Sequence, residues 1–366
     1  MDRAWIDGRA TTLKAAIAEA ANLLSSSRFP VIAGLGTDIA GARAAIELAR
    51  RIGAVVDHMH ARPLLAHLDA VRESGTLITT PGEAVARADR ILLLGPSIAT
   101  AFPELRELVA APTGPETGAT GRRIFWLCPD RAAVAALGDA LDLAVIGRNR
   151  AELPILLAAL RARIAQRPIA RTSVSVKAID ALAADLAAAR FGVVLWSTAD
   201  LDALTTEMVY GVVADLNMKA RFAGLPLHPG DNAQGVLQVC GWMTGFPMRT
   251  GFGRSQPEHD PWHFDAARLV ATGEADCALW ISAYRAAAPD WANDVPTIAL
   301  AGTEIGLRRP ARVAIGVGQP GIDHDGVEYV AVAGTLAAVA AARPSSTPSV
   351  AQVLAEVTLA LPHASA

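Results

Sequence analysis

Apolar residues along the chain follow two alternating patterns, which predict strands that alternate with helices. Short, continuously apolar runs predict buried strands at 29–34, 54–57, 91–95, 123–128, 143–147, 191–197, 277–282, 296–301, 313–317 and 327–332. Helical periodicity predicts helices at 12–26, 39–52, 200–221, 265–274 and 350–361, and a long helical stretch over 152–189 that breaks near 168–172. Strands alternating with helices of about ten or more residues are typical of βαβ units and a parallel sheet.

Two segments from different halves of the chain resemble each other. GEAVARADRILLLGPS at 82–97 and ARLVATGEADCALWISA at 267–283 each contain a helix, then Ala-Asp, then an apolar strand that ends at a serine. The repeat predicts an α/β fold of two interleaved Rossmann-like lobes with parallel sheets and a ligand cleft at the carboxyl ends of the strands. We expect the lobes at 1–170 and 171–344, followed by a linker and a C-terminal helix at 345–366.

The composition restricts the classes of partner. The 366 residues carry a net charge of −3 without a clustered basic stripe, so nucleic acid is not an expected partner. No apolar run reaches the ~18–20 residues of a membrane span, and the first residues lack a signal-peptide pattern. We therefore expect a cytoplasmic location. Because 52% of the residues are hydrophobic and only 19% are charged, we also expect extensive contact with other subunits.

Two short motifs at strand ends each have a chemical and a structural interpretation. Gly34-Leu35-Gly36-Thr37-Asp38 follows a strand and opens a helix like a dinucleotide turn, but its glycine spacing is wrong for phosphate binding. We favour a structural strand–helix turn with Thr37 or Asp38 as the helix cap. His58-Met59-His60, followed by His67, has the spacing of metal ligands, yet no companion motif follows. A solvated loop is the preferred interpretation there, so we expect no bound metal.

Cysteine chemistry is limited to Cys128, Cys240 and Cys277, which are far apart in apolar contexts and form no CxxC. We interpret them as buried, reduced thiols rather than ligands of a compact iron–sulfur or zinc site.

The segment 223–254 concentrates Gly, Asn, His, Trp, Met and Arg in a chain that is otherwise rich in Ala, Leu and Val. It predicts a strand, a polar turn from His228 to Asn232, a helix that ends at Gly245, and a loop bearing glycine and arginine. Residues of these types gather where the backbone must approach a ligand closely. The candidate ligand-binding residues are His228, Gly230, Asn232, Gly235 and Arg254.

The stretch DLNMKARFAGLPLHPGDNAQGVLQVCGWMTGFPMRTGF at 215–252 resembles the B subunit of formylmethanofuran dehydrogenase, a molybdopterin or tungstopterin oxidoreductase family. The resemblance includes EADCALWISA at 274–283 and FPVIAGLGTDIAGARAAIELARRIGAVVDH at 29–58. It is strongest with the bacterial branch, the B subunits of formyltransferase/hydrolase complexes. It implies a molybdopterin-oxidoreductase-like core, in which the five candidate residues would line a vestigial pterin pocket.

The chain departs from the metallopterin-bearing members of this family at two places. Those members begin with a cysteine-rich segment that binds a [4Fe–4S] cluster, and this sequence has no cysteine before Cys128. The family's metal-ligating Cys would fall in the loop Asp57-His58-Met59-His60-Ala61-Arg62-Pro63, which also has none. We therefore expect no cofactor and no catalytic residue in this chain.

The function implied by the resemblance is that of a non-catalytic structural subunit of a formyltransferase/hydrolase complex. Such a complex converts formyl-tetrahydromethanopterin via formylmethanofuran to formate. The resemblance assigns this chemistry to two of the partner subunits, an amidohydrolase-like one (A) and a transferase (D), and implies a further partner (C). Contact with a methanofuran-type carrier is a further expectation. The alternative is a working metallopterin subunit of a formylmethanofuran dehydrogenase.

Overall fold

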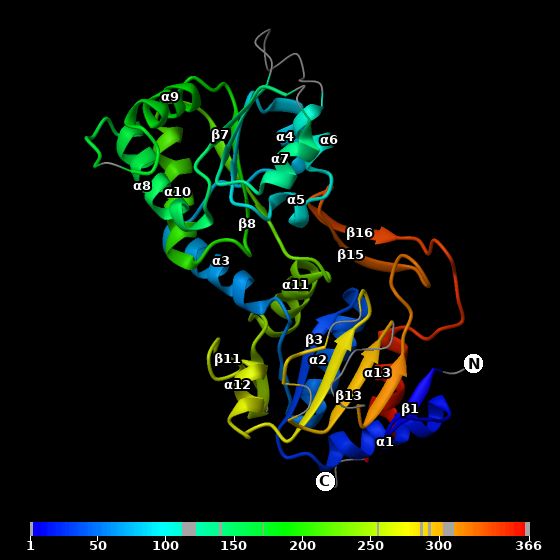
Figure 1. Cartoon of the computed structure of the whole chain (residues 1–366). Coiled ribbons are helices and arrows are strands. Elements are labelled where there is room, and N and C mark those ends of the chain that lie inside the picture. Colours follow the sequence, from blue (N-terminus) through cyan, green and yellow to red (C-terminus); the bar gives the residue numbers. More distant parts are fainter. Residues whose placement is uncertain are drawn as a thin grey trace. The chain divides into compact units, whose positions relative to one another are not determined.

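The computed structural model describes residues 3–111, 122–138, 141–170, 172–254, 256–285, 288–291, 294–302 and 311–362 (Figure 1). The chain forms two compact units, and each draws on separate parts of the sequence. The first unit comprises residues 1–61, 230–329 and 336–366, and the second comprises 62–229 and 330–335. These boundaries differ from the sequential lobes expected at 1–170, 171–344 and 345–366. Strands close in sequence do not all share a sheet, because the chain leaves the first unit after residue 61 and returns at 230.

The first unit contains a nine-stranded sheet in the described part of the chain. In spatial order its strands are β11 (Gln256–His259), β10 (Thr250–Arg254), β4 (Val55–Val56), β3 (Pro30–Gly36), β12 (Cys277–Ser282), β13 (Thr297–Ala301), β14 (Val313–Gly316), β1 (Ala4–Ile6) and β2 (Arg9–Ala10). The five central strands, from β4 to β14, are parallel, and the strands at both edges pair antiparallel. Ile32 pairs with Leu279 on one side and with Val56 on the other.

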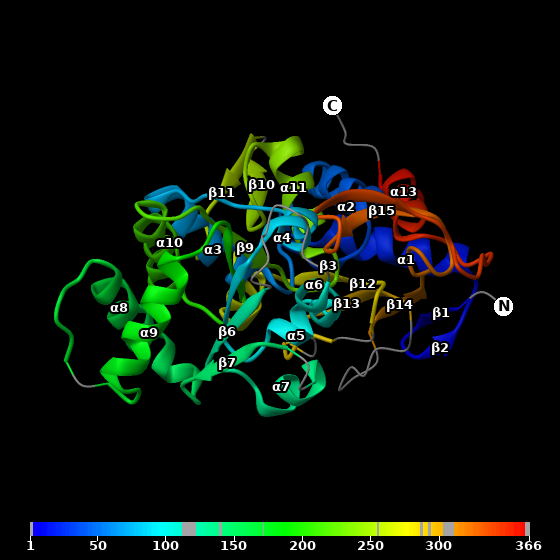
Figure 2. The ribbon, with the colours of Figure 1, turned by 90° about the horizontal axis from the view of Figure 1, so that it is seen from above.

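Helices cover this sheet and connect its strands: α1 (Leu13–Ser26), α2 (Ile39–Ile52), α11 (Ala233–Thr244), α12 (Ala266–Ala271) and α13 (Val350–Ala360). Helix α13 packs against α1 and α2, and α11 packs against α2; Figure 2 shows these four helices along one side of the strands. Helix α12 instead covers Val31, Val55 and Ala278. The C-terminal helix is thus part of the core of the first unit, and a Ser349–Gln352 capping box fixes its start.

The second unit contains a five-stranded parallel sheet in the order β7 (Leu143–Ile146), β6 (Arg123–Leu127), β5 (Arg90–Leu94), β8 (Gly192–Ser197) and β9 (Phe222–Leu227). Its helices are α3 (Ala61–Ser74), α4 (Pro81–Arg87), α5 (Ile98–Ala101), α6 (Leu105–Ala110), α7 (Arg131–Leu137), α8 (Leu153–Ile164), α9 (Val176–Ala187) and α10 (Ala203–Asn217), with a 3₁₀ turn at Arg150–Glu152. β15 (Gly326–Val330) and β16 (Thr335–Val339) form a separate two-stranded sheet.

Both faces of the five-stranded sheet are buried, which explains why its strands read as continuous apolar runs. Leu92 and Leu94 pack into the core beneath α8, α9 and α10. Ile91 and Leu93, the alternate residues, pack into a second core with α4, α5, α6 and α7. Figure 1 shows these two groups of helices on opposite sides of the strands.

The repeat seen in the sequence corresponds to equivalent strands of the two sheets. β12 lies between β3 and β13, and β5 lies between β8 and β6. In their own sheets, β12 pairs parallel with β3 and β5 pairs parallel with β8. The expectation of two interleaved Rossmann-like α/β lobes with parallel sheets is confirmed.

Two local predictions are wrong. Helix α10 begins at Ala203 and not at residue 200, because Asp202 is its cap and accepts a hydrogen bond from the Thr205 N–H. The residues expected as a loop after Gly245 form the antiparallel hairpin β10–β11. Glycine is depleted in strands, but here Thr250 and Gly251 pair with β4, so the hairpin extends the nine-stranded sheet at one edge.

No helix in the described residues is long and apolar enough to cross a membrane. Several large apolar side chains are nevertheless exposed, including Leu77, Ile78, Leu204, Met218, Trp242, Trp262 and Leu359. Where exposed apolar side chains gather into one patch, they mark a surface at which another molecule can bind.

Candidate functional site

The candidate site lies where β3, β4 and β12 end, at the carboxyl edge of the nine-stranded sheet. From β3 the chain passes through α2 to β4 on one side, whereas β12 leads to β13 on the other. The order of the strands therefore reverses between β3 and β12. Such a switch point is where open parallel α/β sheets place their ligands.

Asp57 anchors the loop that follows β4. Its carboxylate accepts hydrogen bonds from the backbone N–H groups of His58 at 2.9 Å and Ala266 at 3.0 Å. The Arg249 guanidinium lies 3.4 Å away and also pairs with Asp265. Burial raises the pKa of Asp57 to about 7, against the opposing effect of Arg249 and of these backbone donors. This network holds the loop against the adjacent strand and helix.

His58 has no free ring nitrogen. Its Nδ1 accepts from the backbone N–H of His60 at 2.9 Å, so Nε2 carries the proton of the neutral ring and donates to the Asp231 carbonyl at 3.2 Å. Burial lowers the pKa of His58 to about 3. A neutral imidazole with both nitrogens engaged serves neither as a metal ligand nor as a general base.

His60, Asp231 and Arg285 form a compact polar cluster beside His58, and we call these three residues the edge triad. His60 Nε2 lies 2.9 Å from Asp231 Oδ2 and 2.8 Å from the Arg285 guanidinium, which also pairs with Asp231. Burial disfavours the charged form of Asp231, but the hydrogen bond from His60 and the charge of Arg285 outweigh it, so the pKa lies below its ordinary value. Asp231 is thus a paired carboxylate, and the half-exposed Arg285 is the cation a ligand would meet.

Asn232 joins three parts of the first unit. Its Nδ2 donates to the Thr37 carbonyl at 2.9 Å, and its Oδ1 accepts from the Tyr329 N–H at 2.9 Å. Asp231 and Asn232 both have positive φ, of 57° and 55°, a backbone conformation that is unusual outside glycine. Gly235 leaves room for this side chain, because a Cβ there would lie 2.2 Å from Asn232 Oδ1.

Replacement of Gly235 by alanine is therefore expected to displace the Asn232 side chain and destabilise the first unit by about 1–3 kcal/mol, the cost of leaving buried hydrogen-bonding groups unpaired. The matched control is Gly241→Ala on the same helix, where a Cβ would meet no atom within 4 Å. That variant should be neutral or more stable by up to about 1 kcal/mol. Urea unfolding curves measure both, and equal effects at the two positions would contradict the role given to Gly235.

The motif at 34–38 forms a structural strand–helix turn, as the favoured interpretation predicted. Asp38 caps α2 by accepting from the Gly41 N–H at 2.9 Å, so its carboxylate takes the place of an anion at the helix N-terminus. A Cβ at Gly34 would lie 2.5 Å from the Ile281 carbonyl oxygen. Gly34 therefore permits the close contact between β3 and β12.

The five candidate residues belong to three parts of the structure. Asn232 and Gly235 lie together beside the edge triad, and a Cβ at Gly230 would contact nothing within 4 Å. Arg254 lies in the β10–β11 hairpin with an 83% exposed side chain, 3.6 Å from Glu258. His228 belongs to the second unit, where its ring packs edge-on against His67 at a centroid distance of 5.4 Å.

Two residues of the edge triad were not identified from the sequence as candidates. Asp231 lies inside the polar turn that was singled out, and its position between Gly230 and Asn232 was a usable signal. Arg285 offered none, because it reaches the triad only through the pairing of β12 with β3. Tyr284, the residue before it, donates a hydrogen bond to Glu328 at 2.8 Å.

The residues at this edge do not fit a thiolate-ligated metallopterin. The three cysteines are buried, and desolvation raises the pKa of Cys128 to about 11 and of Cys240 and Cys277 to about 12. In the described ranges, no group of three or more His, Cys, Asp or Glu side chains is arranged to hold a metal ion. The positions around the loop after β4 are instead taken by ion pairs within the protein.

Comparison with known proteins identifies the relatives of this fold. No family model matches the chain. It is 35% identical over 360 residues to the B subunit of the formyltransferase/hydrolase complex Fhc of Methylorubrum extorquens, covering 97% of this chain and 95% of that protein. It is 26% identical over 350 residues to the B subunit of the tungsten-containing formylmethanofuran dehydrogenase 2 of Methanocaldococcus jannaschii, covering 88% of this chain and 77% of that protein.

A solved structure agrees with the sequence comparison. A chain in the crystal structure of the formyltransferase/hydrolase complex (FhcABCD) from Methylorubrum extorquens, in complex with methylofuran, superimposes with a TM-score of 0.87. The two chains are 34% identical, and the match covers 97% of each. The protein therefore belongs to the family of the Fhc B subunits, with a more distant relationship to the B subunits of formylmethanofuran dehydrogenases.

Proposed function

We propose that this protein is a non-catalytic structural subunit of a formyltransferase/hydrolase complex in the cytoplasm. Its partners are the A, C and D subunits, of which A is amidohydrolase-like and D is the transferase. The complex converts formyl-tetrahydromethanopterin via formylmethanofuran to formate. The observation that carries the proposal is the match over 97% of both chains to a subunit of FhcABCD.

The edge triad supports the non-catalytic part of the proposal. Asp231 is ion-paired, His58 is neutral with both nitrogens engaged, and the loop from Asp57 to Pro63 has no cysteine. We interpret the segment from His228 to Arg254 as inherited architecture. Asn232 and Gly235 support this interpretation because their contacts are made within the chain.

A catalytic metallopterin subunit of formylmethanofuran dehydrogenase is the second candidate function. It is favoured by the 26% identity to the B subunit of a tungsten-containing enzyme. It requires a metal ligand that the cysteines do not supply. Contact with a methanofuran-type carrier is compatible with both functions, because the related complex was crystallised with methylofuran.

The two functions predict different metal contents for the assembled complex and different effects of an edge-triad variant on its turnover. We expect the chain, co-produced with its A, C and D subunits, to purify as one complex with tungsten and molybdenum far below one atom per complex. The variant Asp231→Asn is expected to assemble and to keep formyl transfer and hydrolysis within about twofold, because it alters no group that touches the reacting atoms.

Elemental analysis, pterin extraction and turnover of the formylated carrier measure these outcomes on one preparation. Stoichiometric tungsten or molybdenum together with loss of turnover in Asp231→Asn would establish the catalytic alternative. Omission of this chain from the co-expression should prevent assembly, and a complete and active complex without it would contradict a structural role.

A further inference from the structure

We propose that the second unit binds, along the edge of its sheet beyond β9, an extended, apolar segment of another subunit, with one basic side chain of that segment opposite Glu207. This inference rests on the proposed function, since it assumes that the chain works within a complex. It names the surface and the kind of partner that the family relationship leaves open.

The first observation is an unpaired strand edge. Residues 76–79 follow α3 and lie parallel to β9, with an isolated bridge between Ile78 and Gly224. The Gly224 N–H donates to the Leu77 carbonyl at 2.7 Å, and the Thr79 N–H donates to the Gly224 carbonyl at 2.9 Å. In a parallel bridge of this form, the N–H and C=O of Ile78 point away from β9. Within the described ranges, neither group has a hydrogen-bond partner.

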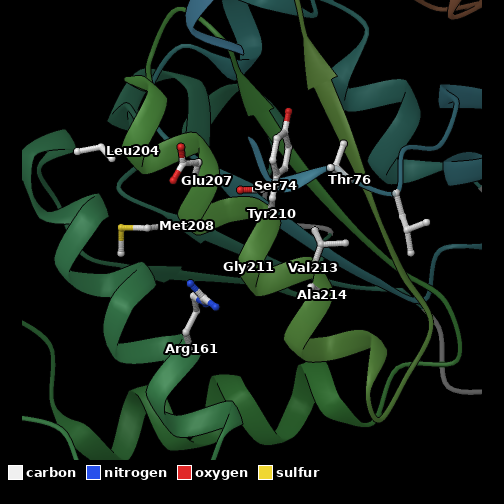
Figure 3. Close-up of a pocket in the computed structure, with 12 residues that line it drawn as sticks. Ser74, Thr76, Arg161, Leu204, Glu207, Met208, Tyr210, Gly211, Val213 and Ala214 are labelled. Carbon is white, nitrogen blue, oxygen red and sulfur yellow. The ribbon is translucent and has the colours of Figure 1, made fainter. Parts of the chain in front are cut away.

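The second observation is an apolar groove beside that edge. It has a volume of about 720 Å³ and runs between residues 74–77 and one stripe of α10 (Figure 3). Leu204, Glu207, Met208, Gly211 and Ala214 form the stripe, at the spacing of successive helical turns. Leu204 is 71% exposed, and Leu77 is 58% exposed on the opposite wall. Large, exposed apolar side chains that line an open groove predict an apolar occupant.

The charges of the groove specify the occupant further. Arg161 lies against Gly211, where a Cβ would come within 2.3 Å of its Cζ, and its Nε donates to Asp215 at 2.8 Å. The positive charge of Arg161 is therefore balanced. Glu207 is half-buried in the groove wall and has no ion pair or hydrogen bond to any residue the structure describes. One negative charge thus remains, and a lysine or arginine of the partner would neutralise it.

The strand edge and the groove together favour an extended segment over a helix. A strand added beside Ile78 gains main-chain hydrogen bonds, and its alternate side chains point to the face on which Leu77 lies. Exposed edges of this kind are aggregation-prone unless they are covered. The 65% exposed side chain of Ile78 is consistent with an edge that is covered by another subunit.

Incorporation of purified full-length chain into a complex of the other subunits tests the proposal. We expect Ile78→Pro, which removes the outward N–H, Leu204→Asp and Glu207→Arg each to weaken incorporation at least about tenfold. The matched controls are Ile78→Val, which keeps the backbone donor, and Met218→Asp, which alters an 84% exposed side chain of the α10 C-cap outside the groove. Both controls should incorporate within about twofold of the wild-type chain.

Amide hydrogen exchange and cross-linking identify the occupant. Exchange at Ile78 should slow at least tenfold in the assembled complex, and a photo-cross-linking residue at position 208 should join this chain to a different subunit. Equal incorporation of all three groove variants, or a cross-link to a second copy of this chain, would overturn the inference and leave the proposed function standing. Failure of the wild-type chain and both controls to incorporate would overturn both.

Discussion

Replacement of Arg249 by leucine is expected to cost the first unit about 2–3 kcal/mol of unfolding free energy, because the Asp57 carboxyl, whose pKa burial raises to about 7, and the Asp265 carboxylate both lose their shared cation. The two side chains are 14% and 7% exposed and lie 3.4 Å apart. Asp57 also fixes the backbone of His58 and the start of α12. Loss of the guanidinium should therefore loosen the loop that carries the candidate site.

The matched control for Arg249→Leu is Arg254→Leu in the same region of the chain. Arg254 is 83% exposed, and an exposed ion pair contributes little to stability, so this change should stay within about 0.5 kcal/mol. The double variant Asp57→Asn/Arg249→Leu should recover part of the loss, because a neutral amide at position 57 needs no cation. Urea unfolding of all three proteins at pH 7 measures the effect. Similar losses for Arg249 and Arg254 would contradict the buried network.

Acid should destabilise the second unit through its buried histidines. His67 Nδ1 forms a hydrogen bond with the Tyr210 hydroxyl at 2.9 Å, and its ring packs against His228 and Trp196. Burial lowers the pKa of His67 to about 4, and burial together with the charge of His67 lowers that of His228 to about 3. The unfolded chain, with histidine pKa values near 6.5, therefore binds more protons than the folded chain below pH 6.5.

The sign of the pH effect follows from that difference. Unfolding free energy should be highest above pH 6.5 and fall as the pH drops towards 4, by about 2 kcal/mol for His67 at pH 5. Asp57, with its pKa raised to about 7, acts in the opposite direction, so the total slope alone is not diagnostic. The variant His67→Gln retains Asp57 and an acceptor for Tyr210. Its stability loss between pH 7 and pH 5 should be about 2 kcal/mol smaller than that of the wild type.

Urea unfolding at both pH values measures this difference. Parallel stability curves for the wild type and His67→Gln would show that His67 is not held neutral by the fold. His228→Gln provides a second test of the same cluster. Its effect should not be additive with that of His67→Gln, because a proton on one ring disfavours a proton on the other.

Most strands and helices could be predicted from the sequence, because they depend on local periodicity and caps. Helix α2 has the bounds that periodicity predicted, and Asp38 caps it as one of the two expected residues. Gly245 ends α11 in a left-handed conformation, as expected from its place after the last apolar turn. The errors occurred where long-range pairing overrides local preference, as in the β10–β11 hairpin.

The candidate site was only partly predictable. His58, His60 and Asn232 stood out as unusual residues in an apolar chain, and the structure places all three at the carboxyl edge of the nine-stranded sheet. Arg254 stood out for the same reason but lies in the β10–β11 hairpin, and His228 belongs to the second unit, because residue type carries no information on which sheet a turn joins.

The sequence by itself determined the alternation of strands and helices, the repeat between the two lobes, the absence of a cysteine in the loop after β4, and the family resemblance. Only the tertiary structure decided which strands share a sheet, that Arg285 meets Asp231, and that Ile78 presents an unpaired backbone beside an apolar groove. Local patterns record which face of an element is buried. Contacts between residues distant in sequence depend on how the chain returns to each sheet, and no local pattern contains that information.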